Sequence, residues 1–239
     1  MKKNVILVAL LGVFVACNSL GDKGYLISGE AKGIEDGKNV ILQKQDTLGM
    51  GFVNVDTVKV KGGKFEIKGE VTEMAMHFLQ VEGTQGVVPL ILENGEINVT
   101  VDKDSIFKSA VKGTFNNDAF DKFNKESMTI SKRIQKKMMA FEQQNMQLIQ
   151  QAQTTQDTAI MNKLMKEASV IQQEQKDYFT NYPEKNPKSY ISVLILDNMI
   201  KDPQADMAKI EKIYKSFDES IKKTKAGKNV EKAFGLKKK

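Results

Sequence analysis

The sequence is poor in the residue types that carry most redox and enzymatic chemistry. Its 239 residues include one cysteine, Cys17, one histidine, His77, and no tryptophan. A single cysteine excludes an intrachain disulfide and a cysteine-based metal cluster, and a single histidine excludes most catalytic triads. There is also no glycine-rich phosphate loop, zinc-ligand spacing or nucleophile elbow. The sequence therefore predicts no cofactor, no bound metal and no enzymatic activity.

Concentrated positive charge is almost absent too. The formal net charge is +6, and the two lysines at positions 2 and 3 account for part of it. The remaining lysines are interspersed with many carboxylates, apart from three consecutive lysines at 237–239. Such a short terminal run is typical of a solvated tail. We therefore expect no nucleic-acid partner and treat 237–239 as a basic tail.

The N-terminus has the organisation of an export signal. Two lysines precede an apolar run over residues 5–15, and the small residue Ala16 stands directly before Cys17. A transmembrane helix needs about 20 apolar residues, so this run is too short to span a bilayer. The pattern predicts a signal peptide over residues 1–16 that is removed from the mature protein.

The end of this run, Phe14-Val15-Ala16-Cys17, resembles the lipobox of bacterial lipoproteins, although Phe14 replaces the usual leucine. The resemblance implies that Cys17 is acylated and becomes the first mature residue. Each buried acyl methylene adds about 0.8 kcal/mol of membrane affinity, so several chains would anchor the protein firmly. We expect a lipid anchor in the outer membrane on its periplasmic face, with 17–24 as a tether. An ordinary signal peptide cut near Ala16 is the alternative.

Residues 25–114 alternate apolar and polar side chains in short runs divided by glycine and asparagine, which is typical of strands. Two hairpins are expected. One joins 56–60 to 65–69 through Gly62-Gly63, and the other joins 87–92 to 97–101 through Asn94-Gly95. Further strands are expected at 25–29, 40–43 and 77–81. About seven short strands with frequent turns predict an antiparallel β-sandwich.

Residues 115–236 have a different, helical character. Glycine and proline are scarce over 117–181, where glutamine, lysine, methionine and glutamate dominate. Apolar residues recur at steps of three and four on both sides of Thr154-Thr155. This spacing predicts two long helices packed as an antiparallel, coiled-coil-like hairpin. The fold class is therefore α+β in two parts, an N-terminal antiparallel β-sandwich followed by a C-terminal α-helical hairpin or bundle.

The ends of the later helices are suggested by proline and serine. Pro183 and Pro187 are expected to end the second long helix. Ser189 is expected to cap a third helix that runs to about residue 200, and Pro203 to open a fourth.

Three groups of side chains are candidates for chemical sites. Met74, Met76 and His77 are ligand types that suit Cu(I), but packing at a strand edge is the favoured interpretation. Glu93 and Glu96 flank a turn and resemble an acid/base pair, but charges at a hairpin tip are normally solvated. The methionines of the long helices are expected to fill irregular helix interfaces. These are residues 138, 139, 146, 161 and 165.

The strand region resembles the N-terminal domain of unknown function in thioredoxin-like thiol-disulfide oxidoreductase lipoproteins. The segments that carry the resemblance are 29–33 (GEAKG), 36–40 (DGKNV), 56–60 (DTVKV), 62–69 (GGKFEIKG), 92–95 (LENG) and 111–114 (VKGT). It continues in 186–192 (NPKSYIS) and in Tyr214 with 222–230, so it extends over nearly the whole mature chain. In that family a Cys-X-X-Cys pair carries the redox reaction, and this sequence has no such pair.

Three functions follow as expectations. The first is a non-catalytic lipoprotein whose helical hairpin binds another protein, either a thioredoxin-like protein or a second copy of itself. The second is a lipoprotein that binds a small molecule or glycan, which the absence of tryptophan disfavours. The third is a docking subunit for a separately encoded thiol-disulfide oxidoreductase.

Overall fold

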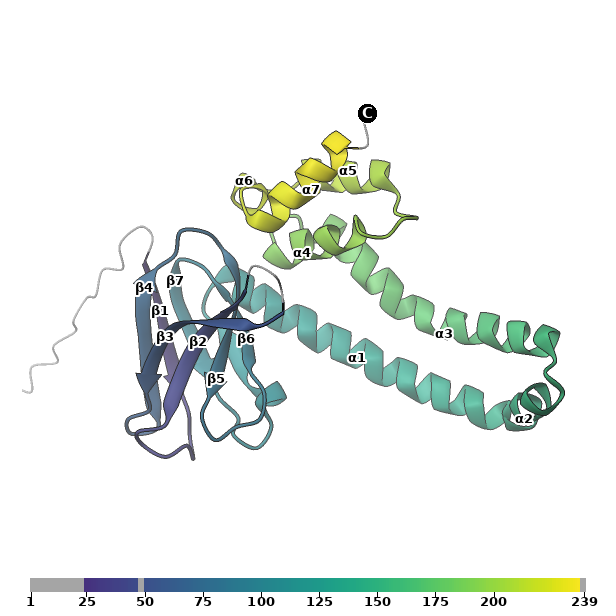
Figure 1. Ribbon diagram of the computed structural model, residues 1–239, viewed down its shortest axis with the longest axis horizontal. Helices are drawn as coiled ribbons and strands as arrows, with labels where there is room; N and C mark the ends of the chain where they lie inside the picture. The colour runs from purple at the N-terminus through teal and green to yellow at the C-terminus, as the bar shows by residue number, and fades with distance from the viewer. Residues whose placement is uncertain (1–23, 47–49, 237–239) are drawn as a thin grey trace, which may run out of the picture.

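The computed structural model describes residues 24–46 and 50–236. A β-sandwich forms one end of the molecule, a long helical hairpin projects from it, and a group of shorter helices lies beside the base of the hairpin (Figure 1). The expected α+β class, with strands first and helices after, is confirmed. The predicted signal peptide (1–16), residues 17–23 of the predicted tether and the predicted basic tail (237–239) lie outside the described residues, whereas Gly24 is the first residue of a strand.

Eight strands make up the described part of the sandwich. They are β1 (Gly24–Glu30), β2 (Asn39–Gln45), β3 (Phe52–Lys59), β4 (Lys64–Glu70), β5 (Ala75–Val81), β6 (Val88–Leu92), β7 (Gly95–Thr100) and β8 (Ala110–Lys112). One sheet has the order β4-β1-β7-β8 and the other β3-β2-β5-β6. Alternate residues of both sheets point inward, as shown by the fully buried Ile27, Ile67 and Ile97 of the first sheet and Leu42 and Leu79 of the second.

Both expected hairpins are wrong in their pairing. β3 pairs with β2 while β4 pairs with β1, so the chain crosses from one sheet to the other at Gly62-Gly63. The chain returns to the other sheet for β5 and β6 and then crosses again in the same direction, between β6 and β7 at Asn94-Gly95. The two glycines at 62 and 63 do adopt the expected positive φ, 57° and 69°. The glycine turn itself is therefore confirmed, but a tight turn does not decide which strands pair beyond it.

The crossing at Asn94-Gly95 also introduces a parallel pair into a sandwich that was expected to be antiparallel. β7 enters the first sheet beside β1 and runs in the same direction, with Ile27 opposite Ile97. All other pairs among the described strands are antiparallel.

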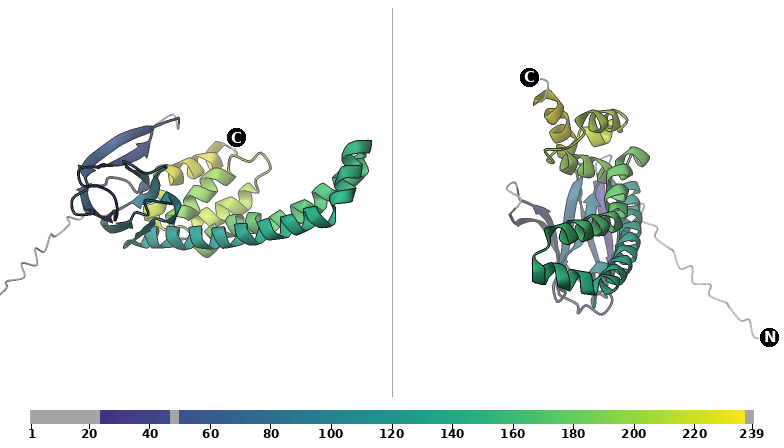
Figure 2. Two further views of the ribbon diagram at one scale, coloured as in Figure 1. Left: turned by 90° about the horizontal axis from the view of Figure 1, so that it is seen from below. Right: turned by 90° about the vertical axis from the view of Figure 1, so that its right-hand side faces the viewer.

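Seven α-helices follow in the described residues. They are α1 (Phe115–Gln144), α2 (Met146–Thr155), α3 (Thr158–Lys185), α4 (Tyr190–Met199), α5 (Met207–Lys215), α6 (Glu219–Lys222) and α7 (Lys225–Leu236). α1 and α3 run antiparallel as the expected hairpin, with α2 at its far end (Figure 1). Figure 2 shows the hairpin bending along its length and reaching well beyond the sandwich.

Several helix ends differ from expectation. A break at Asn145, where the side chain donates to the Phe141 carbonyl, separates α2 from α1. Pro183 lies inside the last turn of α3, which ends at Lys185. The helix that was expected to open at Pro203 is α5, and it begins at Met207. The Asp206 carboxylate accepts the N–H of Lys209 and caps the helix there.

A second core lies between the C-terminal helices and the base of the hairpin. It contains residues from α4 to α7, including the fully buried Val193, Leu196, Ile210 and Ile221, together with Phe123 of α1 and Tyr182 of α3. Ile91 of strand β6 belongs to this core and not to that of the sandwich. The two halves of the molecule are therefore joined by packing as well as by the chain.

Candidate functional site

A polar joint fixes the direction in which the hairpin leaves the sandwich. Asn117 is completely buried at the start of α1; its side-chain oxygen accepts the Ile91 N–H at 2.9 Å, and its amide nitrogen donates to the Ile91 carbonyl at 2.7 Å. The two bonds mimic an additional pairing partner for the edge strand β6. Covering an edge in this way leaves no unpaired backbone groups at that position. The first turn of α1 is thus held rigidly on the sheet.

Neighbouring Asn116 ties the same turn to α4. Its amide nitrogen donates to the Glu93 carboxylate at 2.7 Å, and its side-chain oxygen accepts the Tyr190 N–H, also at 2.7 Å. Glu93 accepts the Asn116 backbone N–H as well. A carboxylate at the first turn of a helix is favourable, because the helix dipole is positive there. Sandwich, hairpin and α4 therefore meet at one hydrogen-bonded point.

The hairpin has two chemically different sides. On one side Arg133 and Lys137 of α1 both contact Glu174 of α3, at 2.6 and 3.3 Å. The other side faces α4 and carries mainly apolar and uncharged polar side chains. A charged side is easily solvated, whereas an apolar side that is left open to water is a candidate for a binding surface.

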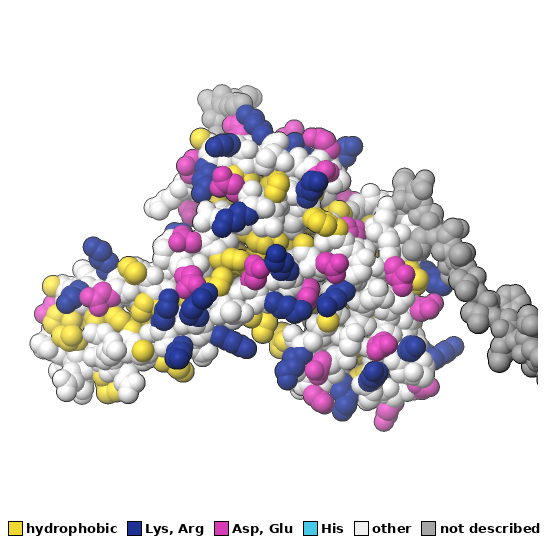
Figure 3. All heavy atoms as spheres, turned by 180° about the vertical axis from the view of Figure 1, so that it is seen from behind, with side chains coloured by type: hydrophobic (Ala, Val, Ile, Leu, Met, Phe, Trp, Pro, Cys, Tyr) yellow, Lys and Arg dark blue, Asp and Glu magenta, His cyan; other side chains and the backbone are white. Residues whose placement is uncertain are grey.

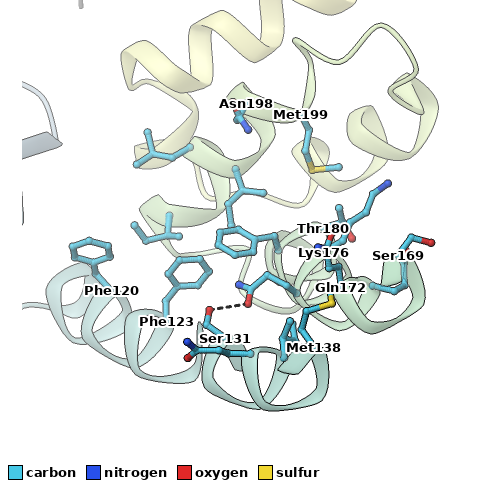
Figure 4. A pocket seen from close by; sticks show the side chains of 18 of the residues that line it. Phe120, Phe123, Ser131, Met138, Ser169, Gln172, Lys176, Thr180, Asn198 and Met199 are labelled. Atoms are coloured by element: carbon cyan, nitrogen blue, oxygen red, sulfur yellow. Dashed lines mark hydrogen bonds between the residues drawn. The ribbon is translucent and has the colours of Figure 1, made fainter. Parts of the chain in front are cut away.

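That second side forms a groove of about 1210 Å³ between the hairpin and α4. Its apolar lining comes from β5, α1, α3 and α4, namely Met76, Phe120, Phe123, Ile134, Met138, Met139, Phe179, Ile191, Leu194, Ile195 and Met199. Figure 4 shows Phe120, Phe123 and Met138 on the side of α1, with Asn198 and Met199 opposite them. From behind, apolar side chains are visible where the hairpin meets the C-terminal helices (Figure 3).

The rim of the groove is polar but almost uncharged. It is formed by Ser131, Gln135, Ser169, Gln172, Gln173, Gln175, Thr180 and Asn198. Lys176 and Glu142 are the two charged side chains among the lining residues. Gln175 is held in place by Ser131 and Ser127, at 3.1 Å each (Figure 4 shows the first of these bonds). Such a surface matches an apolar ligand with polar edges better than a charged one.

An aromatic cluster makes the inner end of the groove rigid. The Phe123 ring lies 5.4 Å from that of Tyr178, 5.3 Å from that of Phe179 and 4.7 Å from that of Tyr182. The Tyr178 hydroxyl donates to the Glu126 carboxylate at 3.0 Å, and burial together with this bond raises the tyrosine pKa. The cluster supplies a firm apolar floor and stays neutral at physiological pH.

The methionines of the long helices and Glu93 do not have the surroundings that the sequence predicts. Met139, Met146 and Met165 are at least 60% exposed, so the expectation that they fill a helix interface within this chain is wrong. Met138 is half-buried, and both Met138 and Met139 line the groove. Glu93 is not a solvated turn residue, because it bonds to Asn116 in the joint. No pattern in the sequence signalled that contact.

The suspected copper ligands do not converge. His77 is buried, and its Nδ1 lies 3.2 Å from the Ala75 carbonyl oxygen. Met76 precedes it on β5, so the two side chains point to opposite faces of the sheet, and Met76 lines the groove. Burial lowers the histidine pKa. His77 is therefore a packed strand residue, but not at an edge as expected, because β5 lies between β2 and β6.

The sandwich and the first turns of α1 match the model of a known domain family. Residues 25–120 match the model of a domain of unknown function (DUF4369). The matched region ends at residue 120, just after Asn116 and Asn117 of the polar joint, so most of the hairpin, including most of the groove, lies beyond the DUF4369 region. Neither a curated protein nor a solved structure matches the chain.

Two further observations concern the described residues only. Residues 24–46 and 50–236 contain no group of three or more histidine, cysteine, aspartate or glutamate side chains placed to hold a metal ion. None of the helices in these ranges is both long and apolar enough to cross a bilayer.

Proposed function

We propose that this chain is a non-catalytic interaction protein of the bacterial envelope, tethered by a lipid on Cys17, and that it binds the apolar side of a partner helix. The groove between the hairpin and α4 carries this proposal. It is open, larger than the roughly 300–1,000 Å³ typical of small-molecule sites, and bounded by helices along its length. An amphipathic helix laid into such a groove completes a helical bundle.

The lining chemistry supports a helix as the occupant. Met138, Met139 and Met199 are flexible, polarisable side chains that adapt to an irregular apolar surface. The glutamines and serines of the rim offer hydrogen bonds to the polar flanks of a helix without imposing a charge.

The two charges of the groove favour one direction for that helix. Gln175 bonds to Ser127 and Ser131, so the adjacent Lys176 lies nearer the base of the hairpin than Glu142, which lies near its far end. A helix is positive at its N-terminus and negative at its C-terminus. A partner helix is therefore expected to lie with its N-terminus beside Glu142 and its C-terminus beside Lys176, parallel to α3.

Location rests on the N-terminal segment. The export signal and the lipobox-like residues before Cys17 support a lipid anchor, and we propose the periplasmic face of the outer membrane as its site. The resemblance to thioredoxin-like oxidoreductase lipoproteins supports a second candidate for the partner, a separately encoded protein with a Cys-X-X-Cys pair. In that case the chain is the docking subunit of a divided oxidoreductase.

Site-directed crosslinking in the native envelope tests this function. A photoreactive amino acid replaces Gln172 on the groove rim, and in a matched variant it replaces Asp177, an exposed residue on the charged side of the same helix. We expect a defined crosslinked protein from position 172, none from position 177, and loss of the product when Leu194→Glu places a charge in the groove. Crosslinks of equal yield from both positions, or from neither, would overturn the proposal.

The identity of the crosslinked protein separates the candidates. A Cys-X-X-Cys protein supports the docking subunit, and any other helical protein supports the general interaction module. If native mass spectrometry instead finds a small apolar molecule that Leu194→Glu releases, the groove is a small-molecule site and the helix proposal is wrong.

A further inference from the structure

The outer side of α1 carries a second unexplained surface, of which only the end residue Met139 also borders the groove. Residues 127–141 contain four cationic side chains and no carboxylate. Arg133 and Lys137 share Glu174, whereas Lys132 and Lys136 are exposed and form no ion pair within the described part of the chain. These four cations and one carboxylate leave a local charge of about +3 within roughly two helical turns.

Exposed methionines flank the two unpaired lysines on the same side of the helix. Met128, Lys132, Lys136 and Met139 follow steps of three and four, which places them along one face. Met128 is 52% and Met139 60% exposed. We call these four residues the Lys/Met stripe. Solvation of the two lysines does not account for the large exposed apolar side chains on either side of them.

The end of the hairpin continues this apolar character without charge. From residue 143 to residue 156 the sequence has no charged side chain, and Met146 and Leu148 are exposed. Figure 3 shows apolar side chains scattered over the end of the hairpin. Cations with neighbouring exposed apolar groups are the pattern of helices that lie at a membrane interface.

We propose that the Lys/Met stripe rests on an anionic phospholipid surface. Lys132 and Lys136 contact lipid phosphates, and Met128 and Met139 enter the headgroup layer between them. Lysine is a flexible point charge that suits a fluid array of phosphates. Each lysine held near such a surface strengthens binding by about fivefold, so the stripe alone binds weakly and serves to orient a protein that is held by another anchor. This inference does not depend on what occupies the groove.

The test places a reporter in the stripe of the native, lipidated protein. Met128→Cys, at the end of the stripe that does not line the groove, provides a thiol for an environment-sensitive fluorophore, and the protein is reconstituted into vesicles that contain spin-labelled phospholipid. We expect quenching in vesicles with phosphatidylglycerol, and several-fold less quenching in pure phosphatidylcholine or at high salt. Lys132→Glu with Lys136→Glu should abolish the difference, whereas the charge-matched Lys209→Glu with Lys212→Glu on α5 should preserve it.

Two outcomes would overturn the inference. One is the absence of quenching in anionic vesicles, and the other is quenching that is independent of lipid charge. A second form of the protein, with Cys17→Ala in place of the anchor, is tested by flotation with the same vesicles at high lipid concentration. Anionic-lipid-dependent flotation of that form shows that the stripe binds lipid even if the proposed lipid anchor on Cys17 is wrong.

Discussion

The side-chain oxygen of Asn116 accepts the backbone N–H of Tyr190 at 2.7 Å, across 74 positions of sequence. This bond joins the first turn of the hairpin to the first turn of α4. It therefore fixes the two walls of the groove relative to each other. Because the Asn116 side chain also binds Glu93, one residue couples the sandwich, the hairpin and the C-terminal helices.

Asn116→Ala should destabilise the protein by about 2–4 kcal/mol, because the buried Tyr190 N–H and the Glu93 carboxylate each lose a hydrogen-bond partner. The free energy of unfolding in urea measures this directly. Asn162→Ala on the exposed side of α3 is the matched control and should change stability by less than about 0.5 kcal/mol. Equal values for the two variants would contradict the role of the joint.

Gly113→Ala should lower the stability of the fold more than Gly37→Ala, although both glycines have positive φ, 105° and 88°. A β-carbon at position 113 would lie 2.5 Å from the Glu96 carbonyl oxygen and 2.9 Å from the Asn98 side chain. At position 37 nothing lies within 4 Å, so only backbone strain of about 1 kcal/mol is expected. Thermal unfolding of both variants compares them. A smaller effect at position 113 would show that the turn before α1 is not tightly packed.

Stability should fall as the pH drops below about 6.5, where the histidine of an unfolded chain gains its proton. Burial, and more weakly the nearby Lys44, hold the His77 pKa below that value in the folded state, although the bond to Ala75 opposes them. The folded protein therefore takes up this proton only at lower pH, and unfolding is favoured in between. Urea unfolding measures the free energy of unfolding at about pH 7.5 and about pH 5.5. This free energy should fall less between the two pH values for His77→Gln than for the native chain. The same loss in both would exclude His77 as the cause.

Sequence patterns predicted the local elements well. The alternating strands, the two long amphipathic helices and the positive φ of Gly62 and Gly63 all follow from residues close together in the chain. Which strands pair with each other could not be predicted from such local patterns. A glycine turn permits a reversal of direction, but packing of the two sheets decides that β3 and β4 separate into different layers.

The site was harder to predict than the fold. The groove depends on how α4 lies against the hairpin, and the contacts that hold it there connect Asn116 with Glu93 and Tyr190. Asparagine near a helix start is normally interpreted as a local cap. Its long-range role is visible only once the three elements are placed together. The exposed methionines were likewise assigned to an interface because sequence alone does not show which apolar positions remain open.

The most direct test of the central claim is methionine oxidation footprinting of the protein in intact cells and after purification. Met138 and Met199 report on the groove, and Met50, which is 82% exposed on the sandwich, is the internal reference. We predict that the two groove methionines are oxidised several-fold more slowly in cells than in the purified chain, relative to Met50, and that Leu194→Glu removes this protection. Identical oxidation rates in cells and in the purified protein would mean that the groove stands empty in the envelope, and would contradict its assignment as a binding surface.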